Sequence, residues 1–424
     1  MQESLFLPPS FLAASNIYEV NIRQYTAEGT FNAFVKHIPR MKEMGVQILW
    51  LMPIFPIGKV ERKGTLGSYY SIADFCTVNS EFGTENDFKN LVQIAHENGL
   101  KIILDWVANH TAWDNVWTKT NPEFFLKNDI GNFTPPFDWE DVIQIDHSNH
   151  AQQAAMINAM QHWVTNFAID GFRADMAHLI PLQFWKDARQ QLSPLKKDLI
   201  WLAETENVEY TEAFDITYTW EWMHTSEAMC KQQISLKDAV QVLEKYKNNF
   251  PTNHHRLFFT SNHDENSWTA TEYEKYGAFT KAMAIFSCMY KSVPLIYSGQ
   301  ESPNYKRLQF FDKDVIEWES GFALQSFYKI LYDVRLRNKL LFENPNILID
   351  EVALLQNILC YKLQNENVEI IVCINFRGEP ANYTIKNLHG SFKNIFNNDV
   401  HTLENEYFLA TESGGYLVLE KVKP

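Results

Sequence analysis

The chain has 424 residues and a formal net charge of −15, without a block of basic residues. Nucleic acids and anionic membranes are bound through clusters of Lys and Arg, so this charge pattern argues against both as partners. Hydrophobic residues make up 46% of the chain, and no apolar run reaches the roughly 18 residues of a membrane span, which indicates a packed globular protein of more than one domain.

The five cysteines are odd in number and show no CxxC spacing. Most of them lie in apolar or mixed segments and are interpreted as small buried hydrophobic residues, which favours a reducing compartment. The first residues, Met1 to Leu5, lack the basic region and following apolar region of a signal peptide. We therefore expect a cytoplasmic protein.

Strand-like and helical segments alternate over most of the chain. The strands are predicted at residues 16–22, 47–52, 101–106, 171–175, 199–204, 214–218, 256–264 and 293–297. The helices are predicted at residues 30–45, 84–99, 149–168, 181–192, 235–250, 277–290 and 323–341. The second helix has a capping-box-like start, because Thr84 is followed by Asp87 three residues later.

Eight near-continuous apolar strands alternating with helices predict an α/β fold with a closed parallel (β/α)8 TIM barrel. An open doubly wound sheet is the alternative, but no Gly-rich phosphate loop follows the first strand. Residues 107–148 break the alternation and are rich in Asn, Asp, Trp and Pro. A loop of this length is usually functional, and it would lie over the carboxyl ends of the barrel strands.

The pattern changes near residue 346. Short apolar runs separated by Asn, Gly and Glu predict strands at residues 352–355, 358–361, 368–373, 383–385, 392–395 and 415–419. We therefore divide the chain into a catalytic barrel, residues 1–345, with a B-domain insert at about 107–148, and a C-terminal antiparallel β-sandwich domain, residues 346–424.

Four of the predicted barrel strands end in an acidic residue. These residues are Asp105, Asp175, Glu204 and Asp264. A buried carboxylate costs several kcal/mol unless it is paired, so this repetition calls for an explanation. Active sites of parallel barrels lie at the carboxyl ends of the strands, where all four acids would meet. We predict that this end of the barrel is the active site.

Two neighbouring carboxyl groups, one ionised and one protonated, perform retaining glycoside hydrolysis. Arg173, two residues before Asp175 on the same strand face, would hold the pKa of Asp175 low. The apolar strand before Glu204 would raise the pKa of that residue through desolvation. Asp175 therefore suits the nucleophile and Glu204 the acid, although Asp175 and Arg173 alone would more often be a structural ion pair.

Two histidines and two of the acids could hold the sugar. His110 and His263 can donate hydrogen bonds to hydroxyl groups, and Asp105 and Asp264 can accept them. Each of these residues also has a structural interpretation; His263 and Asp264, for example, could be half of a metal site. Their joint placement at the strand ends favours the functional interpretation.

With these residues in this order, the sequence resembles the α-amylase superfamily, glycoside hydrolase family 13. Residues 105–110, 171–175 and 262–264, together with Glu204, match the four conserved segments of that family. The match also includes residues 49–56 and 67–75, and it covers about residues 16–340.

The resemblance implies roles for the matching residues. Asp175 would be the nucleophile, Glu204 the general acid/base, and Asp264 would bind the 2- and 3-hydroxyls of the reacting sugar. Tyr70 would stack against that sugar, and Asp105 would bind its 6-hydroxyl or orient the arginine. The other residues implied in sugar binding are His110, Arg173 and His263.

The resemblance is incomplete at the calcium site that many members of the family have. Those members use the asparagine of the first segment, and Asn109 is present here. The histidine that they place four residues after the nucleophile is Leu179 in this chain, and His178 lies one residue early. Ca2+ is therefore not supported by the ligand pattern, and we expect no required cofactor and no metal ligands.

The implied function is a retaining α-glucan hydrolase that acts on α-1,4 or α-1,6 bonds of maltooligosaccharides or starch-derived dextrins. A transglycosylase with the same acids is the alternative, because the two activities differ only in the acceptor of one intermediate. A non-catalytic glucan-binding member is a third hypothesis, but such members typically lack one or more of the catalytic acids, and Asp175, Glu204 and Asp264 are all present.

Overall fold

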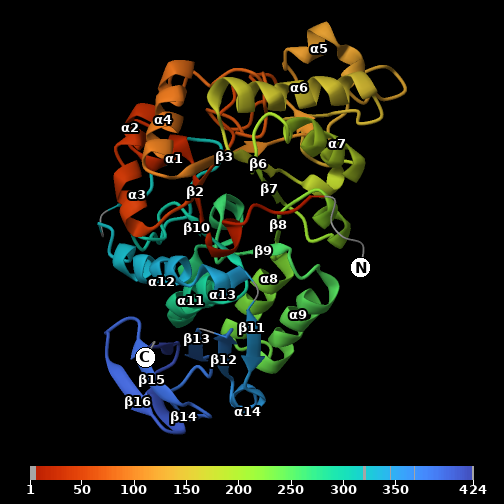
Figure 1. Ribbon diagram of the computed structural model, residues 1–424. Coiled ribbons are helices and arrows are strands. Elements are labelled where there is room, and N and C mark those ends of the chain that lie inside the picture. The colour runs from red at the N-terminus through yellow and green to blue at the C-terminus, as the bar shows by residue number, and fades with distance from the viewer. Residues whose placement is uncertain (1–5, 319–320, 344, 367, 423–424) are drawn as a thin grey trace.

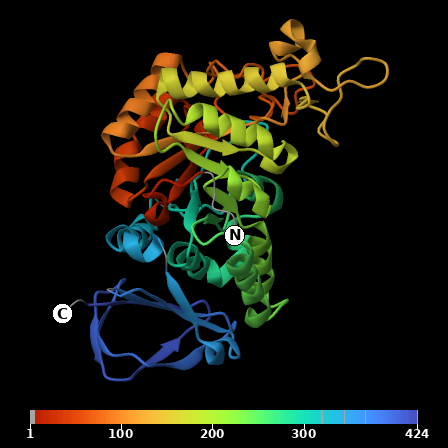
Figure 2. The same ribbon diagram turned by 45° about the vertical axis from the view of Figure 1, so that its right-hand side comes forward.

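The computed structural model describes residues 6–318, 321–343, 345–366 and 368–422. Met1 to Leu5, on which the signal-peptide prediction depends, lie outside the described residues. Figures 1 and 2 show a barrel surrounded by helices and a separate β domain, in blue, at one end of the molecule. Among the described residues, no helix combines the length and the apolar character that a membrane crossing requires.

The predicted barrel is confirmed as a closed ring of eight parallel strands. Around the ring the order is β1, β10, β9, β8, β7, β6, β3 and β2. In chain order the strands are β1 (Ile17–Val20), β2 (Ile48–Leu51), β3 (Lys101–Trp106), β6 (Gly171–Ala174), β7 (Ile200–Ala203), β8 (Ile216–Tyr218), β9 (His255–Phe258) and β10 (Val293–Tyr297).

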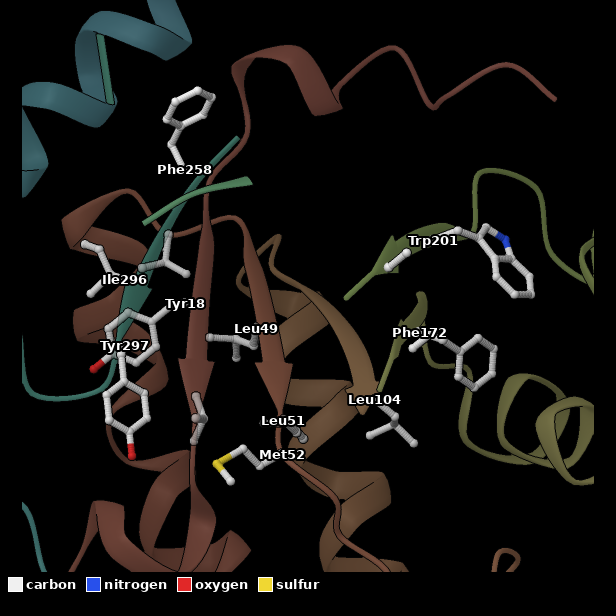
Figure 3. Packing of buried hydrophobic residues seen from close by; sticks show 14 of the residues in the cluster. Tyr18, Leu49, Leu51, Met52, Leu104, Phe172, Trp201, Phe258, Ile296 and Tyr297 are labelled. Carbon is white, nitrogen blue, oxygen red and sulfur yellow. The ribbon is translucent and has the colours of Figure 1, made fainter. Parts of the chain in front are cut away.

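Side chains alternate between the inside and the outside of the barrel, as the two-residue period of a strand requires. On β2, Ile48 and Trp50 belong to the cluster that fills the barrel. Leu49 and Leu51 belong to the larger cluster between the strands and the surrounding helices, which Figure 3 shows together with Phe172 of β6. Both faces are apolar, which explains why the strands read as continuous hydrophobic runs.

Helices surround the barrel. They are α1 (Ile22–Tyr25), α2 (Phe31–Val35), α3 (Ile38–Met44), α4 (Glu85–Glu97), α6 (His150–Phe167), α7 (Leu182–Leu192), α8 (Trp220–Cys230), α9 (Leu236–Asn249), α10 (Glu272–Tyr276), α11 (Thr280–Met289), α12 (Gln325–Arg337) and α13 (Lys339–Glu343). The capping box of α4 is present, because the side chains of Thr84 and Asp87 each bond the backbone N–H of the other residue.

Two predictions in the barrel need correction, and one helix lacks a prediction. The helix expected at residues 30–45 is divided into α2 and α3, because Pro39 lacks an N–H group and its ring crowds the carbonyl of the preceding turn. The strand expected at residues 256–264 ends at Phe258. Helix α8 was not predicted, and its buried face includes the polar Ser226, which weakens the hydrophobic pattern.

The insert after β3 has little regular structure. It contains the two-stranded sheet β4 (His110–Thr111) and β5 (Ile143–Gln144) and the short helix α5 (Trp117–Thr120). In Figure 2 the insert, drawn in orange, projects beyond the ring of helices.

The C-terminal domain is antiparallel, as predicted. A six-stranded sheet has the order β11 (Asn346–Ile349), β12 (Ile358–Gln364), β13 (Glu369–Asn375), β18 (Tyr416–Lys421), β15 (Gly390–Asn394) and β16 (Val400–Leu403), and a second sheet pairs β14 (Ala381–Lys386) with β17 (Glu406–Thr411). The strand predicted at residues 352–355 is wrong: α14 (Glu351–Leu354) forms there, because the Asp350 side chain caps the N–H groups of Val352 and Ala353.

Candidate active site

The last inward-facing position on five barrel strands carries a polar or aromatic side chain. These residues are Glu19 on β1, Trp50 on β2, Asp105 on β3, Arg173 on β6 and Tyr218 on β8, and all five are fully buried. Asp105 and Arg173 are direct neighbours in the register of β3 and β6. The barrel interior is therefore apolar below and charged at the carboxyl end of the strands.

Arg173 lies at the centre of this layer. Its Nη1 donates to Asp105 Oδ1 at 2.9 Å and to Asp175 Oδ1 at 3.0 Å. Its Nη2 lies 2.8 Å from Glu204 Oε2, a close ion pair that lacks the alignment of a hydrogen bond. The guanidinium also lies over the Trp50 ring at 4.9 Å. One cation thus holds three of the four predicted acids together.

The pKa values of the two proposed reacting acids are both raised. Burial raises the pKa of Glu204, against the opposing charge of Arg173. Burial also raises the pKa of Asp175 well above its usual value, and the nearby carboxylates add to the effect. The prediction that Arg173 holds the pKa of Asp175 low is therefore wrong for the free protein, since desolvation outweighs the arginine.

His263 connects the layer to a second set of hydrogen bonds. Its Nδ1 lies 2.5 Å from Glu19 Oε1, and its Nε2 lies 2.7 Å from the Tyr70 hydroxyl. Burial alone would lower the pKa of His263, but Asp264 and Glu19 raise it well above its usual value. The two carboxylates therefore favour the charged form of His263. The Tyr70 hydroxyl, which His263 Nε2 contacts, donates in turn to Asp105 Oδ2 at 3.0 Å.

Asp264 lies in the connection after β9 and immediately precedes a π-helical turn, Glu265–Thr269. Its side chain is 39% exposed, and its Oδ2 lies 3.2 Å from His263 Nε2. Burial raises the pKa of Asp264, but the charge and hydrogen bond of His263 reverse the effect, and the pKa is lowered. Asp264 therefore presents an ionised carboxylate toward solvent.

His110 differs from His263 in charge. Burial lowers the pKa of His110 to about 3, so the ring is neutral. It packs edge-on against Trp139 of the insert, with ring centres 5.3 Å apart. The insert thus completes one wall of the site.

A cleft of about 580 Å³ opens above the charged layer. Of the eight predicted site residues, five line it: Tyr70, His110, Asp175, Glu204 and Asp264. The other three, Asp105, Arg173 and His263, are almost completely buried and contact the lining residues from below. The full burial of Asp105 and its bond to Arg173 favour the role of orienting the arginine over contact with a sugar hydroxyl.

Other residues of the site were not identified from the sequence. Glu19 ends a barrel strand as Asp105 does, so the same rule could have found it. Trp139 and Asp141 of the insert and Phe310 after β10 also line the cleft. No local sequence pattern predicts that these residues line the cleft, because their positions depend on the folded paths of long connections.

The residues around Asn109 do not fit a calcium ion. Gln144 Nε2 donates to Asn109 Oδ1 at 2.9 Å and to the Asn109 backbone O at 3.1 Å, and the Ile145 N–H also donates to that backbone O at 3.1 Å, so both oxygens of Asn109 already accept hydrogen bonds. Asp146 accepts hydrogen bonds from Ser148. Ca2+ needs 6–8 oxygen ligands. Among the described residues, no group of three or more His, Cys, Asp or Glu side chains is arranged to hold a metal ion.

Comparisons with known proteins point in one direction. The chain matches the family model "Alpha amylase, catalytic domain" over residues 6–143 and 133–333. The structure is similar to that of an α-amylase from Lactobacillus plantarum, with a TM-score of 0.89 and 28% identity over 98% of this chain and 100% of the other. It is equally similar to a maltogenic α-amylase from Thermotoga neapolitana, with a TM-score of 0.89 and 31% identity over 97% and 100% of the two chains.

Two curated relatives are similar over smaller shares of their length. An α-amylase of Haloarcula japonica is 24% identical over 88% of this chain, which spans 57% of that protein. An α-1,4-glucan:maltose-1-phosphate maltosyltransferase of Mycobacterium tuberculosis is 30% identical over 42% of this chain and 28% of its own length. The relatives of this chain thus include hydrolases and a transferase.

Proposed function

The chain belongs to the α-amylase family of glycoside hydrolases, and from this premise we propose that it is a retaining hydrolase of α-glucans. The substrates would be maltooligosaccharides or starch-derived dextrins with α-1,4 bonds. One observation carries the proposal: Asp175 and Glu204 contact the same guanidinium of Arg173 and line one cleft together with Asp264.

In the first step, the Asp175 carboxylate attacks the anomeric carbon while Glu204 gives its proton to the leaving oxygen. The raised pKa of Glu204 favours a protonated acid. Burial raises the pKa of Asp175 as well, so its assignment as the ionised nucleophile rests on the hydrogen bond that its Oδ1 accepts from Arg173 Nη1. Glu204 then takes a proton from water, the water attacks the anomeric carbon, and the bond to Asp175 breaks. Two displacements at one carbon retain its configuration.

The residues around the two acids would hold the reacting sugar. Asp264, ionised and partly exposed, would accept hydrogen bonds from the 2- and 3-hydroxyls. Tyr70 would offer its ring as a stacking surface, and His263 would support both residues as a charged donor. The neutral His110 would donate or accept a bond from the insert side of the cleft.

Transglycosylation is the second candidate, because a maltosyltransferase is among the relatives. It would use the same covalent intermediate and differ only in whether water or a sugar hydroxyl attacks it. An added acceptor such as maltose would then produce longer oligosaccharides, whereas a hydrolase would give shorter products only.

The test compares the protein with its Asp175→Asn and Glu204→Gln variants on maltoheptaose and on pullulan, by release of reducing sugar. Loss of a residue that acts in covalent catalysis should lower the rate by more than about a hundredfold. Each variant removes a charge or a proton and keeps the shape of the side chain.

If a variant keeps more than about a hundredth of the rate, the assigned acids are wrong. If the unchanged protein cleaves neither sugar, the α-glucan proposal fails. If it cleaves them, the ratio between maltoheptaose and pullulan distinguishes α-1,4 from α-1,6 preference.

A further inference from the structure

The connection between β2 and α4, residues 52–84, contacts the insert after β3. Lys63 Nζ forms an ion pair with Asp141 Oδ1 at 3.0 Å. The backbone N–H of Lys59 donates to Asp114 Oδ2 at 2.9 Å, and Ser71 Oγ donates to the backbone O of Asp141 at 3.0 Å. These bonds join two neighbouring connections on the cleft side of the barrel.

The same connection also reaches the segment between β10 and α12. The backbone N–H of Leu66 donates to the carbonyl of Phe311 at 3.1 Å, and that of Thr65 donates to Asp312 Oδ1 at 2.8 Å. In the barrel, β3, β2, β1 and β10 are consecutive neighbours. The three connections therefore form a continuous rim over four adjacent strands.

Side chains of this rim face the cleft. Lys63, Asp141 and Phe311 line it, together with Trp268 from the connection after β9. The Trp268 ring contacts Phe310 and Phe311, with ring centres 5.1 and 5.5 Å apart. An ion pair and an aromatic cluster thus form one wall.

On the side of the cleft opposite the rim, the cleft continues into a second hollow. Met176 and Glu204 line both the cleft and a second hollow of about 310 Å³, which is also lined by His178 and Trp220. These residues come from the connections after β6, β7 and β8, where the rim does not extend. None of the described rim residues named above lines the second hollow.

The position of the general acid defines the direction in which a glucan chain lies in the cleft. The general acid protonates the oxygen of the leaving group, so the leaving part of the glucan lies beyond Glu204, in the second hollow. The sugar that reacts with Asp175, and any sugars before it toward the non-reducing end, must lie on the side of the rim.

We propose that the rim, with the Lys63–Asp141 ion pair, closes the cleft on the non-reducing side. The enzyme therefore releases short maltooligosaccharides from the non-reducing ends of glucan chains, and a long chain cannot pass through in that direction. This inference rests on the function proposed above and adds where along the chain the enzyme cleaves.

The test uses p-nitrophenyl α-maltoheptaoside with a free non-reducing end and the same compound with a 4,6-O-ethylidene group on the last glucose. Products are separated by chromatography. The blocked substrate should react at least about tenfold more slowly, which is the discrimination that one or two extra carbons produce in a closed site. Equal rates on both substrates would overturn the closed end and leave α-glucan hydrolysis intact. Cleavage of neither substrate would instead overturn the hydrolase itself.

A double variant tests the ion pair. Lys63→Ala with Asp141→Ala should bring the ratio of the two rates closer to one, because the blocking group gains space. The matched control is Lys119→Ala with Asp129→Ala, which removes the same two charges from exposed positions of the insert that do not line the cleft. A ratio that stays the same in the double variant and in the control would show that the ion pair does not close the cleft.

Discussion

Glu19 is the carboxylate that keeps His263 charged from within the barrel. It is fully buried, its Oε1 accepts from His263 Nδ1, and its Oε2 has no hydrogen-bond partner among the residues that the structure describes. Asp264 contacts the other side of the imidazole. Glu19 thus acts on the sugar only through His263, as a positioning residue.

Replacing Glu19 by Gln keeps the shape and removes the charge. The pKa of His263 should fall, because the carboxylate beside Nδ1 loses its charge while burial still opposes the charged ring. A hydrogen bond to a charged group contributes about 1.5–3 kcal/mol, so we expect kcat/KM to fall by about ten- to a hundredfold. The loss should grow as the pH rises and His263 loses its proton.

The measurement is the pH profile of kcat/KM on maltoheptaose for the protein and for the Glu19→Gln and Glu19→Asp variants. The aspartate should restore part of the activity at high pH, because it returns the charge. A Gln variant whose profile is lowered by the same factor at every pH would contradict the role of Glu19 in holding the proton.

At the scale of single elements, the barrel could be predicted because its strands are apolar on both faces and its helices have the 3.6-residue period. The errors have local causes. Pro39 divides a helix, and Asp350 caps α14 where the apolar run at residues 352–355 predicts a strand. These effects depend on one residue each, and a hydrophobic average over a window does not detect them.

The site residues that could be predicted from the sequence are those at the ends of barrel strands. Asp105, Asp175 and Glu204 lie at or next to the ends of parallel strands, which must meet. Phe310 lies in a long connection without a period, and it stacks on Tyr70, which is 240 residues away in the sequence. Such a contact follows from the folded path of two connections, and neither segment carries a signal of its own.

The hydrogen bonds between Gln144 of β5 and Asn109 lead to a prediction about the calcium dependence of stability. We propose that Gln144, which bonds two oxygens of Asn109, holds the insert in place without a metal ion. Excess EDTA should then leave the melting temperature unchanged. Gln144→Ala should destabilise the protein by about 1–3 kcal/mol, because the buried Asn109 Oδ1 loses its donor, while the Asn109 backbone O keeps the bond from the Ile145 N–H.

Differential scanning calorimetry with and without EDTA, followed by added CaCl2, measures both effects. Gln233→Ala, at an exposed position outside the insert, is the control and should melt like the unchanged protein. A lower melting temperature in EDTA that CaCl2 restores would show that a metal ion holds the structure.

For the molecule as a whole, an aromatic contact and an ion pair join the C-terminal domain to the barrel domain. Phe376 of the C-terminal domain contacts Phe279 before α11, with ring centres 5.6 Å apart, and Glu420 of β18 pairs with Arg337 of α12. Inside the barrel domain, Glu272 accepts from Thr260 after β9 and from Gln300 after β10. Glu272 thus links two barrel strands to helix α10.

Burial raises the pKa of Glu272 from its usual 4.5 to about 7, although two hydrogen bonds and Lys275 oppose the shift. Between these two pH values the folded protein binds a proton that the unfolded chain has lost. The contribution of Glu272 to stability therefore falls as the pH rises through this window, by about 3 kcal/mol, and stays constant above it.

Glu272→Gln should accordingly melt close to the unchanged protein at pH 5 and at a higher temperature at pH 8, because the amide resembles the protonated acid. Glu274→Gln is the control two residues away. Hydrogen bonds from Arg307 hold the pKa of that exposed acid at about 2. Glu274→Gln should therefore lower the melting temperature at pH 8 or leave it unchanged. A Glu272→Gln variant whose melting temperature differs from that of the unchanged protein by the same amount at both pH values would show that Glu272 is ionised throughout. Its carboxylate would then be stabilised by the bonds to Thr260 and Gln300 strongly enough to outweigh its burial.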